Sequence, residues 1–455
     1  MRADRSALPQ VGADPAFRFP AIVKAALPNG LRAWSVAHRG LPIVSLLLLI
    51  ETGASADPPE RPGLAALTAD LLDEGSGSLS ALEVHDALAR IGAQFDVEVG
   101  PDATLVTLTT MSRFVDRAIE LLADMVVRPQ LDPDEFARVR QLRLNRLMQL
   151  RDVPSAVADR AFARMLYGDH PYGHLPIGTE ASVEAVSLDE VRTFHQATYR
   201  PAHATLIAVG DISADELQTR AAARFADWPD PPTGTQAGGQ GNGSGAPATP
   251  STRLSLIHRA GAAQSELRIG QVAVSRRTPD YFALLVLNTI LGGQFVSRIN
   301  MNLREEKGYT YGARTTFDFR LGRGPFVVQT SVQVDATASA VAEVTAEIDA
   351  IRGSRPVTVE ELALARAALT RGYPRSFETA PQIARGLGQL ALYGLPDDYF
   401  ARFVSNVAAV DAAQVTSAAI QHLHPEQLVT VVVSDRDKVT PLFADTRTEV
   451  HELQV

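Results

Sequence analysis

Two segments of this chain, 224 residues apart, carry the same order of residue types. The first, VSLDEVRTFHQATYRPAHATLIAVGD, begins at Val186, and the second, AVDAAQVTSAAIQHLHPEQLVTVVVSD, begins at Ala409. Each reads as an amphipathic helix, a turn with proline and an apolar strand that ends in an acid. The constant spacing pairs Val191 with Val415, Pro201 with Pro425, Ile207 with Val431, Val209 with Val433 and Asp211 with Asp435. The sequence therefore predicts a tandem duplication.

A second repeat and a break in composition define the expected domains. RPQLDPDEFARVR, from Arg128, resembles RPVTVEELALAR, from Arg355, and this pair follows the same order as the first. Gly, Ser, Pro and small polar residues dominate the stretch between the halves, and such residues form flexible linkers. We expect a first domain at 17–228, a linker at 229–252 and a second domain at 253–445.

Strand and helix patterns are segregated along the first half. Strands are expected within 31–40 and 41–53, helices at 63–75 and 80–92, a hairpin of strands at 93–111, and about three helices between 114 and 198. Runs of strands followed by runs of helices are typical of the α+β class. The duplication then predicts two homologous α+β domains, each a mainly antiparallel sheet with helices packed on one face.

Composition and the length of apolar runs exclude several classes of function. The net charge is −9 with no block of Lys or Arg, so no nucleic-acid partner is expected. Cysteine is absent, which excludes disulfides, Cys-ligated zinc and thiol nucleophiles. The longest apolar run, Ile43–Ile50, is far shorter than the roughly 20 residues of a membrane helix, so no membrane partner is expected. The first 20 residues contain no apolar core, so no signal peptide is expected in this sequence.

One segment of the second half brings together two hydrogen-bond donors. SRINMNLREEK reads as a helix at 297–307, which Gly308 ends, and the following strand begins near Tyr309. Arg304 in the last helical turn and Tyr311 in the strand are then close enough to bind a peptide carbonyl and to stabilise charge that develops on its oxygen. The alternative is structural: Arg304 complements the helix dipole, and Tyr311 belongs to the apolar core.

The histidines and glycines suggest no other site. His170 and His174 lie in HPYGH, where proline and glycine indicate a turn, and His422 and His424 lie at a helix end. We expect His170 and His174 at the surface and not as metal ligands, because no third ligand is near them in sequence. His422 and His424 complement the helix dipole at their position, and they share one side only if the segment is extended. The sequence contains no phosphate-binding glycine loop that joins a strand to a helix, and no G-x-S-x-G elbow.

The whole chain resembles the pitrilysin and mitochondrial processing peptidase family of inverted-motif zinc metallopeptidases. The resemblance is carried by LPNGLRAWSV at 27–36, YGDHPYG at 167–173 with the IGT that follows it, and LNTILGGQFVSRINMNLREEKGYTYGA at 287–313. In that family an arginine and a tyrosine seven residues apart in the last motif bind substrate. Arg304 and Tyr311 fall on these positions, so the resemblance implies that they are substrate-binding residues.

The same resemblance implies that the metal motif is lost. Catalytic members read roughly GLAHFLEHMLFKGT, where two histidines bind zinc and the glutamate is the general base. The segment GLAALTADLLDEGS aligns with it without gaps, so that Ala66 and Asp70 replace the histidines and Ala69 replaces the base. The third ligand of the family is a later glutamate, but 142–154 contains none, and Asn145 and Arg146 lie nearest to its position. No metal is expected in this chain.

The resemblance implies a role in a complex. We expect a non-catalytic, substrate-binding subunit of a heterodimeric zinc metalloendopeptidase, inactive alone, whose Arg304 and Tyr311 serve a homologous bacterial partner that carries H-x-x-E-H. Zinc is expected in that partner only, and unfolded peptides are the expected substrates. The alternatives are an assembly subunit with no role in proteolysis, and an independent hydrolase, for which no nucleophile and base are recognised. Because bacterial pairs of this family can be exported, the periplasm, after removal of a signal, is favoured over the cytoplasm.

Overall fold

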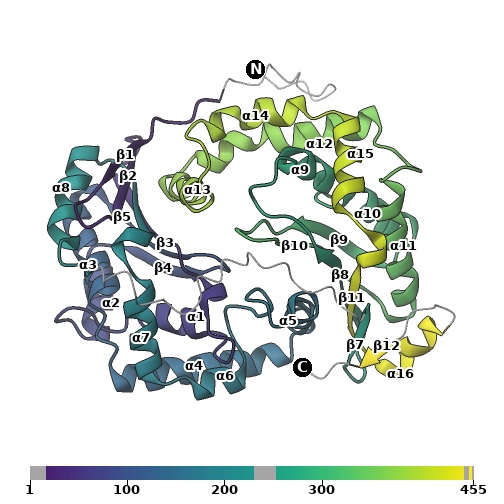
Figure 1. Ribbon diagram of the computed structural model, residues 1–455, viewed down its shortest axis with the longest axis horizontal. Coiled ribbons are helices and arrows are strands. Elements are labelled where there is room, and N and C mark those ends of the chain that lie inside the picture. Colours follow the sequence, from purple (N-terminus) through teal and green to yellow (C-terminus); the bar gives the residue numbers. More distant parts are fainter. Residues whose placement is uncertain (1–16, 230–252, 445–449, 453–455) are drawn as a thin grey trace, which may run out of the picture.

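The computed structural model describes residues 17–229, 253–444 and 450–452. The predicted linker therefore lies, after its first residue, outside the described residues. Each half of the chain forms one six-stranded sheet, and the two sheets stand side by side (Figure 1). The predicted class, two homologous α+β domains, is confirmed.

The first sheet has the strand order β1-β2-β6-β3-β5-β4. Its strands are β1 (Val23–Ala26), β2 (Arg32–Ala37), β3 (Ile43–Ile50), β4 (Gln94–Val99), β5 (Thr104–Met111) and β6 (Ala204–Gly210). All neighbours are antiparallel except β2 and β6. The apolar run that forms β3 lies between β6 and β5, where it is buried on both faces, as its unbroken hydrophobicity predicts.

The second sheet has the order β12-β7-β11-β8-β10-β9 and repeats the first in five strands. Its strands are β7 (Leu254–His258), β8 (Gln264–Val272), β9 (Thr310–Phe317), β10 (Pro325–Gln333), β11 (Val429–Ser434) and β12 (Val450–Glu452). Strand β7 pairs in parallel with β11 and β12, and the other neighbours are antiparallel. The outer strand differs between the two sheets, because β12 comes from the C-terminal end and pairs in parallel, whereas β1 precedes β2 and pairs antiparallel. The repeated segments form equivalent elements, a helix followed by β6 in the first half and by β11 in the second, so the predicted duplication is confirmed.

Helices cover the outer face of each sheet (Figure 1). The first half contains α1 (Leu64–Ala69), α2 (Ala81–Arg90), α3 (Val115–Val127), α4 (Pro133–Arg151), α5 (Pro154–Tyr167), α6 (Glu180–Ala185), α7 (Leu188–Thr198) and α8 (Ala214–Phe225). The second contains α9 (Tyr281–Leu291), α10 (Arg298–Asn300), α11 (Thr337–Ala350), α12 (Val359–Arg371), α13 (Ala380–Tyr393), α14 (Tyr399–Ala409), α15 (Ala412–His422) and α16 (Arg436–Val439). Five helices, not three, lie between 114 and 198, because side-chain caps at Asp132, Thr179 and Ser187 start new helices.

The inner faces of the two sheets are covered by exchanged helices. Helix α5 of the first half packs on β8 and β11 of the second sheet, and α13 of the second half packs on β3 and β6 of the first. Both helices end in the same triplet, Leu-Tyr-Gly, at 166–168 and 392–394, so they are equivalent elements of the duplication. Gly270 on β8 permits this contact, because a Cβ there would lie 2.9 Å from the ring of Phe162. Each half thus completes the core of the other.

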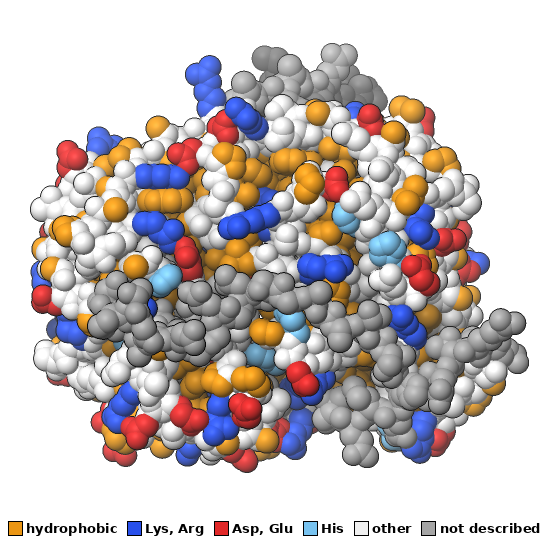
Figure 2. All heavy atoms as spheres, viewed as in Figure 1, with side chains coloured by type: hydrophobic (Ala, Val, Ile, Leu, Met, Phe, Trp, Pro, Cys, Tyr) orange, Lys and Arg blue, Asp and Glu red, His pale blue; other side chains and the backbone are white. Residues whose placement is uncertain are grey.

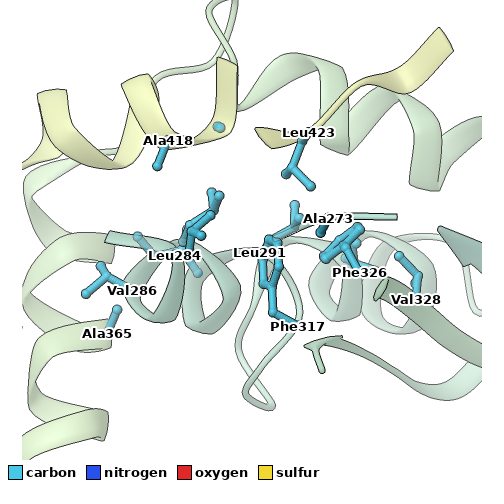
Figure 3. Packing of buried hydrophobic residues seen from close by; sticks show 14 of the residues in the cluster. Ala273, Leu284, Val286, Leu291, Phe317, Phe326, Val328, Ala365, Ala418 and Leu423 are labelled. Atoms are coloured by element: carbon cyan, nitrogen blue, oxygen red, sulfur yellow. The ribbon is translucent and has the colours of Figure 1, made fainter. Parts of the chain in front are cut away.

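The core of the second half is built around α9. Buried side chains of this apolar helix lie between the sheet and the helices α12 and α15 (Figure 3). The labelled residues are Ala273, Leu284, Val286, Leu291, Phe317, Phe326, Val328, Ala365, Ala418 and Leu423. The same cluster continues through α13 to Leu47 and Ile207 of the first sheet, so the two halves share one hydrophobic core. Within the described ranges no single helix is long and apolar enough to cross a membrane, and only α14 and α15, as a pair bent by 99°, reach that length and composition.

A buried histidine gives the fold a predicted pH dependence. His195 is stacked on Tyr199, its Nε2 lies 2.8 Å from the carbonyl oxygen of Val126, and burial lowers its pKa from 6.5. The unfolded chain then binds more protons than the folded chain below pH 6.5, so the free energy of unfolding falls as the pH falls, by at most about 1.4 kcal/mol per pH unit. The His195→Gln variant keeps a hydrogen-bond donor but has no imidazole to titrate, so its free energy of unfolding, measured by chemical denaturation, is expected to fall less with falling pH. An equal pH dependence in the variant and the wild type would contradict this role of His195.

Candidate functional site

Helix α1 lies at the position of the family's zinc motif, and its start is anchored by the side chain of Asp57. The carboxylate of Asp57 accepts hydrogen bonds from the backbone N–H groups of Gly63 and Ala65, both at 2.7 Å. His174 Nε2 lies 3.1 Å from the same carboxylate. Gly63 has φ +98°, and a Cβ there would lie 2.9 Å from the Cα of Gly178, so the start of α1 requires glycine. His174 is thus partly buried and structural, and its predicted surface position is wrong.

Helix α1 is shorter than the sequence predicts. It ends at Ala69, although a helix was expected at 63–75. The next N–H groups, of Leu71 and Leu72, bond to carbonyls three positions back instead of four, so the chain tightens out of the α-helix. Apolar residues continue through this turn and imitate helical periodicity, which is why the end could not be placed from the pattern.

The positions that align with the family's metal ligands carry side chains that do not bind zinc. Ala66 and Ala69 are buried methyl groups. The carboxylate of Asp70 pairs with the guanidinium of Arg143 on α4, and Asn145 is exposed on the same helix. Among the residues that the structure describes, no group of three or more His, Cys, Asp or Glu could hold a metal ion. The residues present here do not fit a zinc ion.

A cavity of about 490 Å³ lies at Asp70. Its polar lining consists of Asp70, Asp73, Glu74, Asp96, Arg143 and Arg146. Burial raises the pKa of the Asp70 carboxyl, and the Arg143 guanidinium opposes that rise. The Arg143 side chain is only 10% exposed, so a buried cation lies beside α1 where the resemblance places zinc.

Metal analysis tests this reading directly. After dialysis against zinc, the isolated chain is expected to retain no stoichiometric metal, because neither Ala66 nor Ala69 offers a ligand and Arg143 repels a second cation from Asp70. Elemental analysis gives the zinc content. The Arg143→Gln variant removes the repelling charge but adds no zinc ligand at Ala66 or Ala69, so it is also expected to retain no zinc. One zinc per chain in the wild type would contradict the assignment.

The segment that carries Arg304 is not a regular α-helix. The expected helix at 297–307 is α-helical only over α10 and continues as a π-helical turn, Met301–Glu306, in which the N–H of Lys307 bonds to the carbonyl of Asn302, five residues back, at 3.0 Å. Gly308, with φ +66°, ends the turn as predicted. The prediction of a continuous α-helix is wrong, since sequence periodicity does not distinguish a single π turn, a feature frequent at functional sites.

Tyr311 lies at the exposed start of the edge strand β9. Its side chain is 92% exposed, whereas Ala313, Thr315 and Phe317, further along the strand, are buried. The alternation is as predicted from Ala313 on, but a bulge in the pairing with β10, between Thr310 and Ala313, interrupts it at Tyr311. The alternative reading of Tyr311 as a core residue is wrong.

Arg304 is held beside Tyr311 by an aromatic ring. Its guanidinium carbon lies 3.3 Å from the ring centre of Phe295, and its Nη2 pairs with Glu305 at 2.6 Å. The side chain is only 12% exposed, and its buried Nε has no hydrogen-bond partner in the part of the chain that the structure describes. A buried donor without a partner is unusual in a folded protein, and the described residues show the same feature at Arg143, Arg160 and Arg352.

Arg304 and Tyr311 line one open cavity of about 520 Å³. Ser155 at the start of the exchanged helix α5 forms part of the same wall. The floor comes from β8, β9 and β10, and its polar side chains are Glu266, Arg268, Arg314, Gln329, Thr330 and Ser331. The cavity can therefore offer several hydrogen-bond donors to an extended backbone.

Two family models together span most of the chain. The model described as insulinase (peptidase family M16) matches residues 35–179, and the model described as the peptidase M16 inactive domain matches residues 185–369. The chain belongs to peptidase family M16. This confirms the family resemblance that the motifs indicate.

Relatives within family M16 are distant but match over most of the chain. A Mycobacterium tuberculosis protein named as an uncharacterised zinc protease is 25% identical over 373 residues, which cover 81% of this chain and 83% of that protein. The crystal structure of a Pseudomonas fluorescens peptidase M16 inactive domain is 26% identical, with a TM-score of 0.82 over 91% of this chain and 98% of that one. A Helicobacter pylori protease, 19% identical, has the same fold, with a TM-score of 0.82 over 91% of this chain and all of that one.

Several residues of this M16 chain escape reasoning from the sequence. Phe295 follows two glycines in the recognised motif, and this is the one signal that could have drawn attention to it. Nothing in the sequence links Arg268 to the cavity, where it is buried and paired with Asp159 of the exchanged helix α5 at 2.6 Å. His422 ends α15, as its place at a helix end predicts, and its Nε2 lies 2.7 Å from the carboxylate of Asp280, a contact that the sequence does not indicate.

Proposed function

We propose that this chain is a non-catalytic, substrate-binding subunit of a heterodimeric zinc metalloendopeptidase. In this proposal the partner is a homologous chain with an intact H-x-x-E-H motif, and zinc belongs to that partner. Arg304 and Tyr311 are the contribution of the present chain to the shared site. Unfolded peptides are the substrate class.

One observation carries the proposal. The chain has no ligand set at α1, yet it presents Tyr311 at 92% exposure and a buried, unpartnered Arg304 Nε on one open cavity. The combination supports the proposal, because no contact among the described residues gives the exposed Tyr311 side chain and the unused Arg304 donor a structural task on the same cavity. A second protein that brings substrate to this cavity gives both groups a use.

The two side chains have separate tasks in this proposal. Peptide hydrolysis places negative charge on the carbonyl oxygen in the transition state, and the Tyr311 hydroxyl is a donor that can stabilise it. Arg304, stacked on Phe295, donates from its guanidinium to a neighbouring backbone carbonyl in this proposal and so holds the peptide extended across the cavity. Zinc in the partner supplies the activated water when it is bound.

Reconstitution tests the proposal. The chain is purified alone, an H-x-x-E-H homologue from the same genome is purified alone, and the two are mixed. Hydrolysis of an internally quenched peptide is expected only in the mixture, together with a heterodimer in size-exclusion chromatography. Full activity of the homologue alone would contradict the proposal.

Two variants separate this function from an assembly role. Arg304→Leu is expected to raise KM in the mixture while it leaves the heterodimer intact, because the peptide loses one backbone anchor. Arg314→Leu, on the floor of the same cavity but hydrogen-bonded to Gln329 at 2.8 Å, is the matched control for loss of positive charge. A complex that forms but never cleaves peptide would favour the assembly role.

A further inference from the structure

The side chain of Asn300 pairs with a backbone peptide as a neighbouring strand would. Its Oδ1 accepts a hydrogen bond from the N–H of Ala313 at 2.8 Å, and its Nδ2 donates to the carbonyl of the same residue at 2.6 Å. The Nδ2 also lies 3.1 Å from the carbonyl of Gln294 and 3.2 Å from Ser297 Oγ. Asn300 is 6% exposed, so this network is shielded from water.

The paired peptide belongs to β9, the edge strand of the second sheet. Asn300 lies four residues before Arg304, at the end of α10, and Ala313 lies two residues after Tyr311. The contact therefore joins the helical segment of one donor to the strand of the other. Further along the same edge, the N–H of Thr315 bonds to the carbonyl of Gly292 at 3.1 Å, which comes from the end of α9 and not from the Arg304 segment.

The covalent link between the two segments offers less restraint. It runs through Gly308, which has φ +66° and no atom within 4 Å of the position of a Cβ. Backbone bonds from the N–H of Tyr309 to the carbonyl of Leu303, at 2.8 Å, and from the N–H of Gln333 to the carbonyl of Tyr309, at 3.0 Å, hold the turn and join it to β10, but neither reaches the peptide of Ala313. A side-chain clamp is the direct way to fix the segments relative to one another.

We propose that Asn300 is a positioning residue that sets the distance and direction between Arg304 and Tyr311. The proposal rests on the proposed function of these two side chains. Only a primary amide offers a donor and an acceptor side by side in the geometry of a peptide group. Loss of the clamp lets the helical segment shift against β9, and a displacement of about 1 Å in a substrate-positioning group can reduce a rate 10²-fold.

Asn302 is a matched control on the same segment. It is also buried, 8% exposed, and its Nδ2 donates to Glu343 and Glu347, both at 2.9 Å, but it makes no contact with β9. Both Asn300→Ala and Asn302→Ala are expected to lower the thermal midpoint. In the heterodimer, only Asn300→Ala is expected to lower kcat, by about 10-fold to 10²-fold.

The pH dependence of kcat in Asn300→Asp is a measurement that a general loss of stability does not change. Its protonated carboxyl has one O–H donor and one carbonyl acceptor and can replace the amide, whereas its ionised form faces the Ala313 carbonyl with a negative charge. The ratio of kcat between this variant and the wild-type complex is therefore expected to rise as the pH falls. A ratio that is constant with pH would overturn the proposal.

Hydrogen exchange of the isolated chain separates this inference from the proposed function. The amide of Ala313 is expected to exchange much faster in Asn300→Ala than in wild type and to keep its protection in Asn302→Ala. Equal protection in all three proteins would overturn the clamp, whatever the activity. If exchange accelerates and Tyr311→Phe slows cleavage but Asn300→Ala does not, the positioning role fails and the proposed function stands. If Tyr311→Phe leaves cleavage unchanged, the proposed function fails, and the positioning role fails with it.

Discussion

Tyr311→Phe is expected to lower the kcat of the reconstituted complex by about 10²–10³-fold, the usual effect of removing one donor to a developing oxyanion. The hydroxyl group is the only change, and the side chain is 92% exposed, so folding and heterodimer formation are expected to remain as in the wild type. Steady-state hydrolysis of a quenched peptide gives kcat, and a thermal melt of the variant verifies its stability.

Tyr309→Phe is the control for this experiment. Tyr309 lies two residues earlier in the chain, is partly buried against the core, and is not among the residues that line the cavity. Its loss of a hydroxyl is expected to leave kcat unchanged. Wild-type turnover by the Tyr311→Phe complex would show that the phenol takes no part in the reaction.

Asp57→Ala is expected to lower the free energy of unfolding by about 3–5 kcal/mol, since it strips a buried carboxylate from its partners. The carboxylate is fully buried and serves Gly63, Ala65 and His174 at once, so its removal leaves unsatisfied donors at the start of α1. Denaturant titration of the isolated chain gives the change in free energy.

Asp57→Asn refines the test, because it keeps one acceptor and is expected to lose less stability than Asp57→Ala. Asp70→Asn is a control at the opposite end of the same helix, where the carboxylate is half-exposed and pairs with Arg143. A loss below about 1 kcal/mol in Asp57→Ala, the range of a single hydrogen bond, would contradict the anchoring role.

The architecture of each half is largely predictable from the sequence, because local patterns determine it. The helix and the strand that follow from Val191 and from Val415 are recognisable from periodicity. The 224-residue spacing correctly pairs α7 with α15 and β6 with β11. The packing of α5 and α13 is not predictable in this way. Their apolar faces are evident in sequence, but a pattern does not specify whether the sheet that covers them belongs to the same half.

The candidate site also has features that the sequence predicts and features that it does not. The motif predicts Arg304 and Tyr311 as substrate-binding residues, and the absence of ligand side chains at Ala66 and Ala69 is visible in the sequence. The π turn, the stacking of Phe295 and the clamp by Asn300 depend on contacts between segments that are separated by loops. Charges of both signs are interspersed over the face in Figure 2, consistent with the lack of a basic block in the sequence.

The reciprocal packing of α5 and α13 has a consequence for the history and the handling of this chain. Two half-length subunits that traded this helix about a twofold axis would have the same contacts, and gene fusion would convert such a swapped pair into a single polypeptide. Neither fragment, 17–229 or 253–444, then carries the helix that covers the inner face of its own sheet. Produced separately, each is expected to aggregate, and coexpression is expected to yield a stoichiometric, non-covalent complex.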